Sequence, residues 1–437
     1  MSFFLHGVHV PHRKHTADKA VFRIESPKTV MLPMSMHIGA PARPLVKVGD
    51  KVKIGTLIGE AVGPVSSPVY ASISGKVTKI FDMILSNGGI APTVVIESDG
   101  EMATDETVAP PVINSAESLI EAIRASGVVG LGGAGFPTYV KFKTDLSRIE
   151  ELIINGAECE PYITSDSVTM ISRADDMEYA ISTMKKYFGI KRIIIGVESN
   201  KKRAIASMKK IAAKDSIVDV CVLPSVYPQG GEKVLVYHTT KKVIAPGKLP
   251  IDVGCVVCNC TTVAAIGNYL KTGMPLVKKC VTVDGACVEN PKNIIVPLGT
   301  LMSDVFDACG GLKGEPFKVL YGGPMMGISV PDLNAPILKN TNAILALSEK
   351  EARLPKTTAC IRCGNCTNHC PFGLAPASIA SAYKKHDAAR LEALFVNNCM
   401  ECGCCSFVCP ANRPLVQTNK LAKAFLKEEK AKEEKKA

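Results

Sequence analysis

The apolar and polar residues between positions 40 and 80 follow a period of two. Val46 and Val48 flank Lys47, Val52 and Ile54 flank Lys53, and turn-forming residues separate the runs at Gly49–Asp50, Gly55, Gly63–Pro64 and Ser74–Gly75. Short alternating runs between such turns are typical of β-strands with one buried face. We therefore predict a small β-barrel domain, which together with an N-terminal arm occupies residues 1–105.

The pattern changes to an α/β type over residues 106–272. Residues 115–126 (SAESLIEAIRAS) place apolar side chains at helical spacing, with Ser115 as the expected N-cap. Residues 151–157 (ELIINGA) and 191–197 (KRIIIGV) are continuous apolar runs, which are typical of parallel strands buried on both faces. We predict an α/β domain over this range.

Two further domains and a tail follow. In residues 273–345, the segment 277–288 (VKKCVTVDGACV) predicts a hairpin and 300–311 (TLMSDVFDACGG) a helix that ends at Gly310–Gly311, so this range forms a small mixed α/β domain. Residues 346–425 are rich in cysteine, and Leu391, Leu394 and Phe395 at helical spacing predict a helical domain. Residues 426–437 form a charged tail.

Charge and composition limit the functional classes. The net charge is +11, from 52 basic and 41 acidic residues, which suits nucleic acid, an anionic membrane surface or acidic redox partners. The basic residues are dispersed, tryptophan is absent and aromatic residues make up only 5%, so we expect no nucleic-acid partner. No apolar run reaches about 18 residues and the N-terminus lacks a signal-peptide core, which predicts an intracellular protein, soluble or peripherally attached to a membrane.

Seventeen cysteines without a secretion signal favour metal ligation in a reducing compartment. Two runs of C-x2-C-x2-C-x3-C occur, each followed by proline (Pro371 and Pro410). This is the spacing of bacterial two-cluster ferredoxins, in which the fourth cysteine of each run ligates the other cluster. We predict two [4Fe–4S] clusters, one on Cys360, Cys363, Cys366 and Cys409 and the other on Cys370, Cys399, Cys402 and Cys405.

Other metal sites are less favoured by the pattern. Structural zinc needs four ligands in two pairs, which does not account for two triplets each followed by an offset Cys-Pro. Three more cysteines lie in an apolar run: Cys255, Cys258 and Cys260. Because free cysteine packs as a small hydrophobic residue, we interpret them as core residues rather than as a third metal site. Pro11 interrupts any helix through the histidines near the N-terminus, which we interpret as a solvated or docking arm: His6, His9, His12 and His15.

A glycine-rich loop lies in residues 127–142 (GVVGLGGAGFPTYVKF), where Gly130, Gly132 and Gly135 match G-x-G-x-x-G. A dinucleotide fingerprint follows a strand, whereas here a helix precedes the loop and only Val128–Val129 is left for a strand. The glycines let the backbone approach a phosphate or a ring. We expect a helix to start at Pro137, with Lys141 in its first turns facing an anionic cofactor.

Four segments in this order resemble the NADH-binding flavoprotein of respiratory complex I: residues 130–142 (GLGGAGFPTYVKF), 154–166 (INGAECEPYITSD), 226–235 (VYPQGGEKVL) and 256–266 (VVCNCTTVAAI). The chain resembles more closely the RnfC family over essentially its whole length. These proteins are the C subunits of the Rnf complex, the membrane-bound ferredoxin:NAD oxidoreductase. The resemblance implies a multidomain α/β protein. Its parts are a lipoyl- or biotinyl-carrier-like β-barrel, a Rossmann-like flavoprotein domain, a β-grasp soluble-ligand-binding domain and a helical twin [4Fe–4S] ferredoxin module.

The resemblance also implies the cofactor residues. The FMN site falls on Gly132, Gly133, Gly135, Lys141, Asn155, Ala157, Glu158, Tyr227, Gly230, Gly231, Val257, Asn259 and Thr262. NADH contacts fall on Phe136 for the adenine, and on Glu160 and Glu232 near the ribose and nicotinamide. The chain departs from complex I at Leu131, Ala157 and Gly231, which replace an arginine, an aspartate and a glutamate.

The function that the resemblance implies is that of a peripheral subunit at the cytoplasmic face of the bacterial cell membrane. Its partners are the other subunits of an ion-translocating complex, NAD(H) and, indirectly, ferredoxin. Nicotinamide exchanges a hydride and the clusters exchange single electrons, so FMN is expected between them and no residue acts as general acid or nucleophile. The alternatives are a soluble NADH-dependent reductase of the same architecture, such as the cobalamin reductases of microcompartments, or a flavin-free electron-transfer adaptor.

Overall fold

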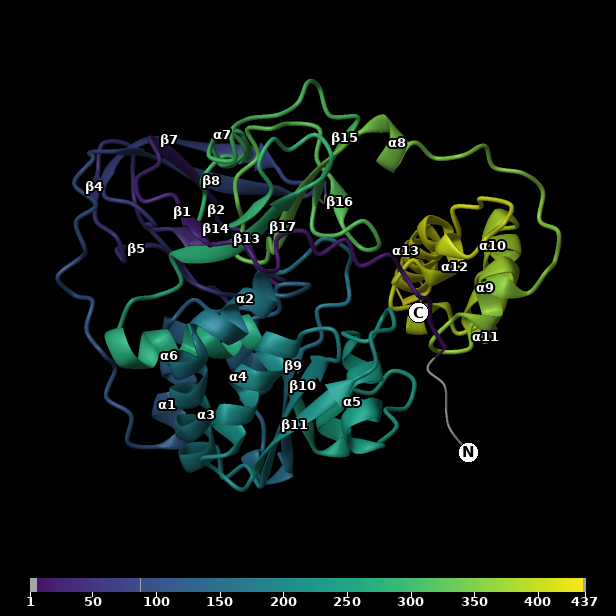
Figure 1. Cartoon of the computed structure of the whole chain (residues 1–437), viewed down its shortest axis with the longest axis horizontal. Coiled ribbons are helices and arrows are strands. Elements are labelled where there is room, and N and C mark those ends of the chain that lie inside the picture. The colour runs from purple at the N-terminus through teal and green to yellow at the C-terminus, as the bar shows by residue number, and fades with distance from the viewer. Residues whose placement is uncertain (1–5, 87, 435–437) are drawn as a thin grey trace.

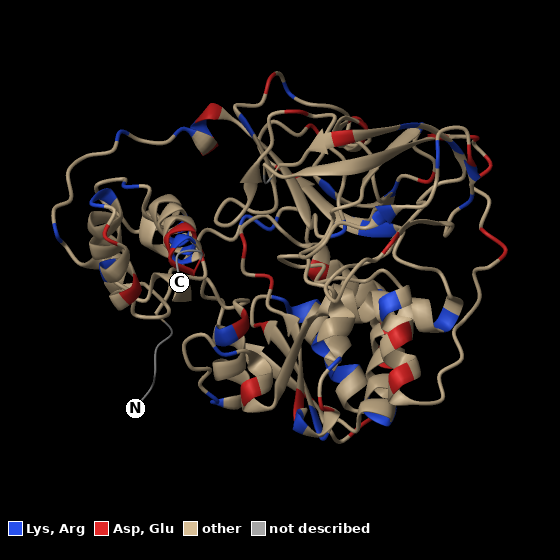
Figure 2. Cartoon of the chain, turned by 180° about the vertical axis from the view of Figure 1, so that it is seen from behind, with Lys and Arg blue, Asp and Glu red and all other residues tan. Residues whose placement is uncertain are grey.

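The computed structural model describes residues 6–86 and 88–434. The chain forms a pair of small antiparallel sheets, a parallel sheet with helices, a mixed six-stranded sheet and a C-terminal helical module (Figure 1). Basic and acidic residues are dispersed over all these parts (Figure 2), as the sequence predicts. No helix in the described part of the chain is long and apolar enough to cross a membrane.

The two antiparallel sheets use the predicted alternation. One has the order β2-β8-β7-β4, with β2 at Thr29–Pro33, β4 at Lys51–Val52, β7 at Gly75–Ile84 and β8 at Ile90–Ser98. The other joins β3 (Arg43–Pro44), β5 (Leu57–Glu60) and β6 (Val69–Tyr70). Val52 and Ile54 are buried, but Val48 is 60% exposed. The run at Val46 and Val48 forms no strand, because Asp50 closes a turn on Lys47.

The parallel sheet has the order β11-β10-β9-β12, with β9 at Glu151–Gly156, β10 at Arg192–Glu198, β11 at Val218–Leu223 and β12 at Cys255–Asn259. The two predicted strands are β9 and β10, and they are buried and parallel as expected. Its helices are α1 (Ala116–Ala125), α2 (Ser165–Ser172), α3 (Ala174–Phe188), α4 (Lys202–Ala212), α5 (Glu232–Thr240) and α6 (Cys260–Thr272). Ser115 caps α1 in a capping box, which confirms that prediction.

The order of this sheet reverses at β9, because β10 lies on one side of it and β12 on the other. Such a reversal opens a crevice at the carboxyl ends of the strands, where open α/β sheets bind their ligands. The glycine-rich loop leads to this point but not into a regular helix. Pro137 precedes a single 3-10 turn (η1, Thr138–Lys141), so the predicted helix is wrong. The backbone N–H groups of Val140 and Phe142 donate to carbonyls three residues back, which is the 3-10 pattern rather than the α-helical one.

The six-stranded sheet has the order β1-β14-β13-β17-β15-β16. Its strands are β1 (Phe22–Arg23), β13 (Lys278–Asp284), β14 (Lys292–Pro297), β15 (Lys318–Tyr321), β16 (Ile328–Ser329) and β17 (Ala343–Leu347), with α7 at Met302–Asp307 and α8 at Glu349–Ala352. The predicted hairpin starts with β13, but its return strand is β14, beyond residue 288. After α7 the chain turns through Gly310 and Gly311, both with positive φ, as predicted.

The N-terminal arm (residues 6–25) lies against three other parts of the chain rather than against the two antiparallel sheets. His6 contacts the carbonyl oxygen of Asn368 in the C-terminal module. Val8 pairs with Tyr227 through two backbone hydrogen bonds of 2.8 and 3.0 Å. β1 then joins β14 as a parallel edge strand. The arm therefore connects all parts that follow the antiparallel sheets.

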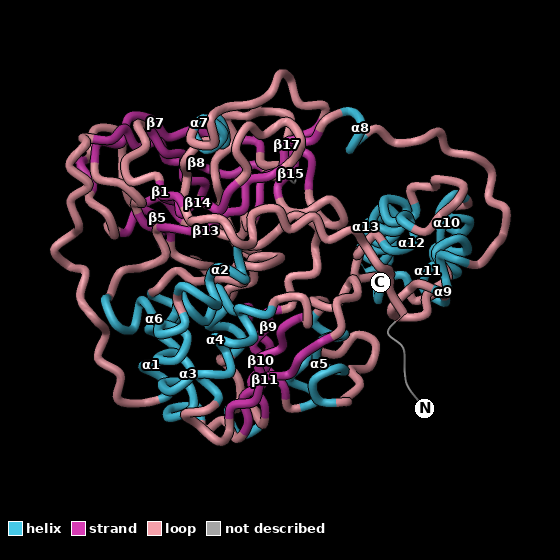
Figure 3. The backbone as a smooth tube through the Cα atoms, viewed as in Figure 1, coloured by secondary structure: helices cyan, strands magenta, loops and turns pink. Residues whose placement is uncertain are grey.

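The C-terminal module (residues 354–434) consists of helices and loops (Figure 3): α9 (Asn365–Asn368), α10 (Pro376–Lys384), α11 (Ala388–Ala393), α12 (Cys404–Phe407) and α13 (Leu415–Glu434). Leu391 is buried in its core, but the predicted helix ends before Leu394 and Phe395. Phe395 has φ of 54° and is 60% exposed, because the chain turns there toward the second cysteine run. α13 extends to Glu434 and makes most of the described tail helical.

Candidate functional site

The glycine-rich loop is held beside the carboxyl end of β12 and the start of α6. The backbone N–H of Leu131 donates to the Thr262 hydroxyl at 3.0 Å, and that hydroxyl donates to the carbonyl of Val129 at 3.0 Å. Gly132 lies so close to Asn259 that a Cβ would come within 2.3 Å of its Nδ2 atom. A Cβ on Gly133, in contrast, would meet no protein atom within 4 Å. The loop thus offers bare backbone to an open space.

Polar side chains border the same strand ends. Lys141 donates from Nζ to the carbonyl of Val257 at 2.7 Å and pairs with Glu232 at 3.3 Å. Asn155, at the end of β9, donates from Nδ2 to the carbonyl of Gly230 at 2.9 Å and accepts from the backbone of Ala157 at 3.1 Å. A cation and an amide beside a glycine-rich turn suit an anionic cofactor.

Two glycines make a close approach to neighbouring segments. A Cβ on Gly230 would lie 2.4 Å from the carbonyl oxygen of Ala157, and one on Gly231 would lie 2.4 Å from Cε of Met400. Met400 belongs to the C-terminal module, between two cysteines of the second run. The absence of a side chain at Gly231 therefore lets that module pack directly beside the parallel sheet.

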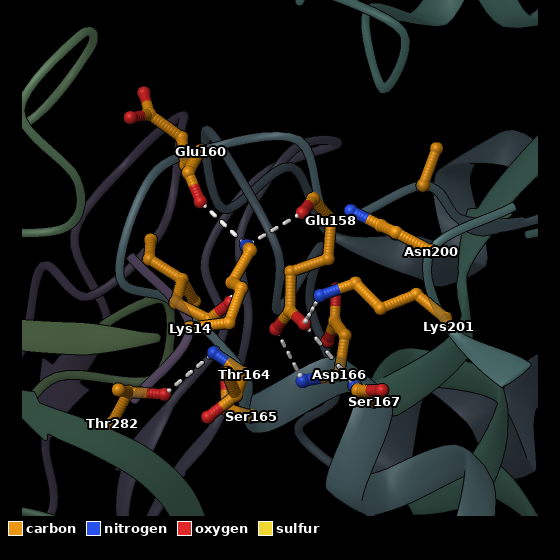
Figure 4. A network of polar contacts seen from close by, with 12 residues as sticks. Lys14, Glu158, Glu160, Thr164, Ser165, Asp166, Ser167, Asn200, Lys201 and Thr282 are labelled. Carbon is orange, nitrogen blue, oxygen red and sulfur yellow. Dashed lines mark hydrogen bonds and ion pairs between the residues drawn. The ribbon is translucent and has the colours of Figure 1, made fainter. Parts of the chain in front are cut away.

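Glu158 is buried and Glu160 is half-buried, and their carboxylates point to different places (Figure 4). Glu158 accepts from the backbone N–H of Asp166 at 2.7 Å, at the start of α2, and pairs with Lys201 at 3.3 Å. Glu160 accepts from the backbone of Met325 at 3.1 Å and Met326 at 2.8 Å, in the loop after β15. Burial raises the pKa of Glu160 to about 7.

Replacing Lys201 by methionine is expected to lower the free energy of unfolding by about 3–5 kcal/mol, since Glu158 then lacks its buried counter-charge. Burial raises the pKa of Glu158 in the folded chain, whereas Lys201 lowers it. A carboxyl group whose pKa is higher in the folded chain than in the unfolded chain destabilises the fold least at a pH below its unfolded pKa. The loss of unfolding free energy in Lys201→Met should therefore grow as the pH rises from acid to neutral. Urea unfolding at acid pH and at neutral pH measures this loss of free energy. Lys202→Met, at the exposed neighbour, is the control, and an equal loss there would contradict the prediction.

Tyr227 joins the parallel-sheet part to the C-terminal module. Its hydroxyl donates to the carbonyl oxygen of Cys402 at 2.7 Å, and its ring is only 2% exposed. Val8, Val10, Cys402 and Cys404 surround it in a small apolar cluster. A residue of the predicted cofactor site is therefore in direct contact with a predicted cluster ligand.

Five cysteines line one cavity of the C-terminal module. One is Cys404, and the other four are Cys370, Cys399, Cys402 and Cys405. These four are the members of one predicted ligand set, although Cys370 is far from the others in sequence. Asn419 of α13 also lines this cavity and donates from Nδ2 to the Cys399 sulfur at 3.5 Å, while its Oδ1 has no partner. Amide donors to cysteine sulfur are typical of iron–sulfur sites.

The other predicted set is more open. Cys360 and Cys363 are exposed, whereas Cys366 and Cys409 pack together against Ala380 and Leu415. Across residues 6–86 and 88–434, no three His, Cys, Asp or Glu side chains converge as the ligands of a single ion do. Cysteines that line one cavity are the residue type that ligates [4Fe–4S] clusters.

Comparisons with known proteins agree along most of the chain. Four family models match in succession: the RnfC barrel sandwich hybrid domain over residues 2–101, the Nuo51 FMN-binding domain over 123–268, the SLBB domain over 280–329 and the 4Fe-4S dicluster domain over 354–410. The C subunit of the Na(+)-translocating ferredoxin:NAD(+) oxidoreductase complex of Acetobacterium woodii is 39% identical over 403 residues, 91% of this chain and 90% of that protein.

Two other relatives have the same kind of name. The C subunit of the proton-translocating ferredoxin:NAD(+) oxidoreductase complex of Clostridium ljungdahlii is 39% identical over 86% of this chain and 83% of that protein. The C subunit of the ion-translocating oxidoreductase complex of Rhodobacter capsulatus is 37% identical over 97% and 83%. The chain belongs to this family of C subunits, the RnfC family.

The remaining sequence-predicted residues of this RnfC family member lie where ordinary packing accounts for them. Cys255 and Cys258 are buried in β12 and Cys260 in α6, and burial raises the pKa of the Cys258 thiol to about 11. His6 and His15 contact Asn368 and Asp284, as a docking arm would. Phe136 is half-buried, and its carbonyl accepts from the backbone of Gly130 at 2.9 Å.

Three residues of the site were not predicted from the sequence. Lys279, buried in β13, donates from Nζ to the carbonyl of Leu131 and so fixes the glycine-rich loop from another domain. Lys14 of the arm donates from Nζ to the carbonyls of Glu158 at 2.9 Å and Glu160 at 2.7 Å. Asn419 is the third. No local pattern marks them, because each reaches its partner across a domain boundary or along a different helix.

Proposed function

We propose that this chain is the NADH-side subunit of an ion-translocating ferredoxin:NAD oxidoreductase complex, in which electrons pass between NAD(H) and two [4Fe–4S] clusters by way of FMN. Membership of the RnfC family and the matches to FMN-binding and 4Fe-4S dicluster domains support this function. The observation that carries it is the contact between Tyr227, at the predicted cofactor site, and Cys402, a predicted cluster ligand.

FMN is proposed to bind beside Gly133, where an added Cβ would meet no protein atom within 4 Å. Gly132, Gly133 and Gly135 would supply backbone, and Thr262 and Asn259 hold or contact the loop. The other residues proposed to hold FMN are Gly130, Lys141, Asn155, Ala157, Glu158, Tyr227, Gly230, Gly231 and Val257. Bound FMN would exchange two electrons with nicotinamide and one at a time with a cluster. The protein around it positions the cofactor and needs no general acid.

For NAD(H) we propose contacts at Phe136, Glu160 and Glu232. Glu232 is accessible, with 43% of its side chain exposed, and its partner Lys141 lies at the strand ends. Both oxygens of Glu160 accept backbone hydrogen bonds from the loop of Met325 and Met326. Its part in nucleotide binding therefore depends on that loop, which the sequence alone does not indicate.

We also propose the ligand sets and the placement of the chain. One cluster would be held by Cys360, Cys363, Cys366 and Cys409, the other by Cys370, Cys399, Cys402 and Cys405, with domains at residues 1–105, 106–272, 273–345 and 346–425 and a tail at 426–437. The relatives' names describe a subunit of an ion-translocating complex, and no described helix could cross a membrane. Both observations support a peripheral subunit, which we place at the cytoplasmic face.

Anaerobic purification followed by cofactor analysis tests this function. We expect about eight irons and eight acid-labile sulfides per chain, since each [4Fe–4S] cluster contains four of each, together with FMN. Addition of NADH should bleach the cluster absorbance. A protein that contains the clusters but neither binds FMN nor responds to NADH would instead be an electron-transfer adaptor, and the proposal would be wrong.

A further inference from the structure

The two predicted cysteine sets have different surroundings. The set of Cys370, Cys399, Cys402 and Cys405 faces the parallel-sheet part, because Cys402 contacts Tyr227 and Met400 lies against Gly231. Cys402 and Cys405 are buried there. This side of the C-terminal module therefore faces the rest of the chain.

The set of Cys360, Cys363, Cys366 and Cys409 faces outward. All residues from 353 to 364 are exposed, and Ile361, between the first two cysteines, is 68% exposed. The loop is nevertheless ordered by contacts to the chain after Cys409. Thr358 donates its backbone N–H to the carbonyl of Ala411 at 3.0 Å, and the Thr357 hydroxyl donates to the carbonyl of Asn412 at 3.0 Å. We call residues 354–363 and 411–413 the Cys360 rim.

The Cys360 rim is basic as well as apolar. It contains Lys356, Arg362 and Arg413 and no aspartate or glutamate, and no acidic residue occurs between Glu351 and Asp387. No ion pair among the described residues includes these three basic side chains. Elsewhere in the module, basic residues do have acidic partners, such as Lys423 with Glu401 and Lys430 with Glu392. The positive charge of the rim thus lacks a counter-charge within the described part of the chain.

We propose that the Cys360 rim is the docking surface for an acidic electron-transfer subunit, whose centre exchanges single electrons with the cluster held by Cys360, Cys363, Cys366 and Cys409. An exposed apolar residue, Ile361, inside a basic surround matches the usual arrangement of an interface core and a charged rim. Complementary charge guides encounter and sets orientation. In each transfer the cluster loses or gains one electron, the partner's centre gains or loses it, and no bond or proton is exchanged. This inference rests on the proposed function.

The test uses a double charge reversal outside the cysteine runs, Lys356→Glu with Arg413→Glu. The matched control is Lys209→Glu with Lys210→Glu, which changes the net charge equally on exposed residues of α4. Each purified chain is mixed with the remaining subunits of the complex, purified in detergent without it, and the dissociation constant is measured. We expect the rim variant to bind about tenfold or more weakly and the control to bind within about twofold of the wild type.

Two controls, one with salt and one with lipid vesicles, distinguish charge attraction between the rim and the subunits from attraction between the rim and a membrane surface. The difference between the variants should shrink at high salt, because the Debye length falls from about 10 Å at 0.1 M to about 3 Å at 1 M. Equal losses in the rim variant and the control, or no loss in either, would overturn the proposal. The proposal would also be overturned if the wild type bound anionic phosphatidylserine vesicles as tightly as it binds the subunits and the rim variant lost that binding.

A second readout separates this inference from the proposed function. NADH should bleach the clusters of the rim variant as fully as those of the wild type, because the rim lies away from Tyr227 and the glycine-rich loop. Normal bleaching with weakened binding is the expected result. Failure of NADH to bleach the wild-type clusters would contradict the proposed function. The docking surface is tested by the binding comparison alone.

Discussion

Replacing Cys370 by alanine is expected to reduce the iron content from about eight to about four per chain and to abolish bleaching of the remaining cluster by NADH. Cys370 lines one cavity with Cys399, Cys402 and Cys405, so its loss removes a ligand of that set although it belongs to the first run in sequence. Because Cys402 contacts Tyr227, a residue of the predicted flavin site, we expect electrons from NADH to reach this set first. Iron analysis and NADH titration measure both effects.

The matched control is Cys363→Ala, in the exposed set. It should lose the same amount of iron, yet NADH should still bleach the cluster that remains. Dithionite, which needs no route through the protein, should reduce the remaining cluster in both variants. If Cys370→Ala kept its response to NADH and Cys363→Ala lost it, the order of the two clusters would be the reverse of the one proposed.

Gly133→Val should yield a folded chain that does not retain FMN. A Cβ on Gly133 meets no protein atom within 4 Å, so the larger side chain enters the space assigned to the cofactor without disturbing its neighbours. Flavin released on denaturation, together with the loss of NADH-dependent bleaching, measures the effect. We expect occupancy to fall at least about tenfold, since a branched side chain cannot share volume with a bound ring or phosphate without the kind of overpacking cost seen in cores.

Two measurements check that the Gly133→Val chain is otherwise intact. The melting temperature and the dithionite reduction of the clusters should match the wild type, because the clusters lie in a different module. Gly133→Ala, which adds a single methyl group, should show a smaller loss of FMN. Full flavin content in Gly133→Val would mean that the glycine-rich loop is not the cofactor site.

Much of the architecture was predictable because the signals are local. The spacing of the eight cysteines singled out two ligand sets, and the structure brings one complete set to a single cavity. Ser115 marked the start of α1, and the apolar runs at 151–157 and 191–197 became the two central parallel strands. Each of these signals depends on neighbouring residues and on a fixed period, which a sequence displays directly.

The features that the sequence did not indicate depend on long-range contacts. Phe395 has helical spacing to Leu391, but the chain leaves the helix there in order to bring Cys399 to the cavity. Glu158 occurs beside the glycine-rich segments in the family pattern, but its carboxylate binds the start of α2 and Lys201. Lys279 and Asn419 act on the loop and on a cysteine from other domains or helices. Spacing along the chain contains no information about such partners.

The N-terminal arm has a consequence for the order in which the protein is completed. His6 leaves the ribosome early, but Asn368, its partner, is 362 residues further along the chain. At about 5–20 residues per second, translation separates the two by roughly 20–70 seconds. Tyr227 and β14, which pair with Val8 and β1, also arrive long after the arm. The arm is therefore synthesised before every segment that binds it, and it can take its final place only once those segments have emerged.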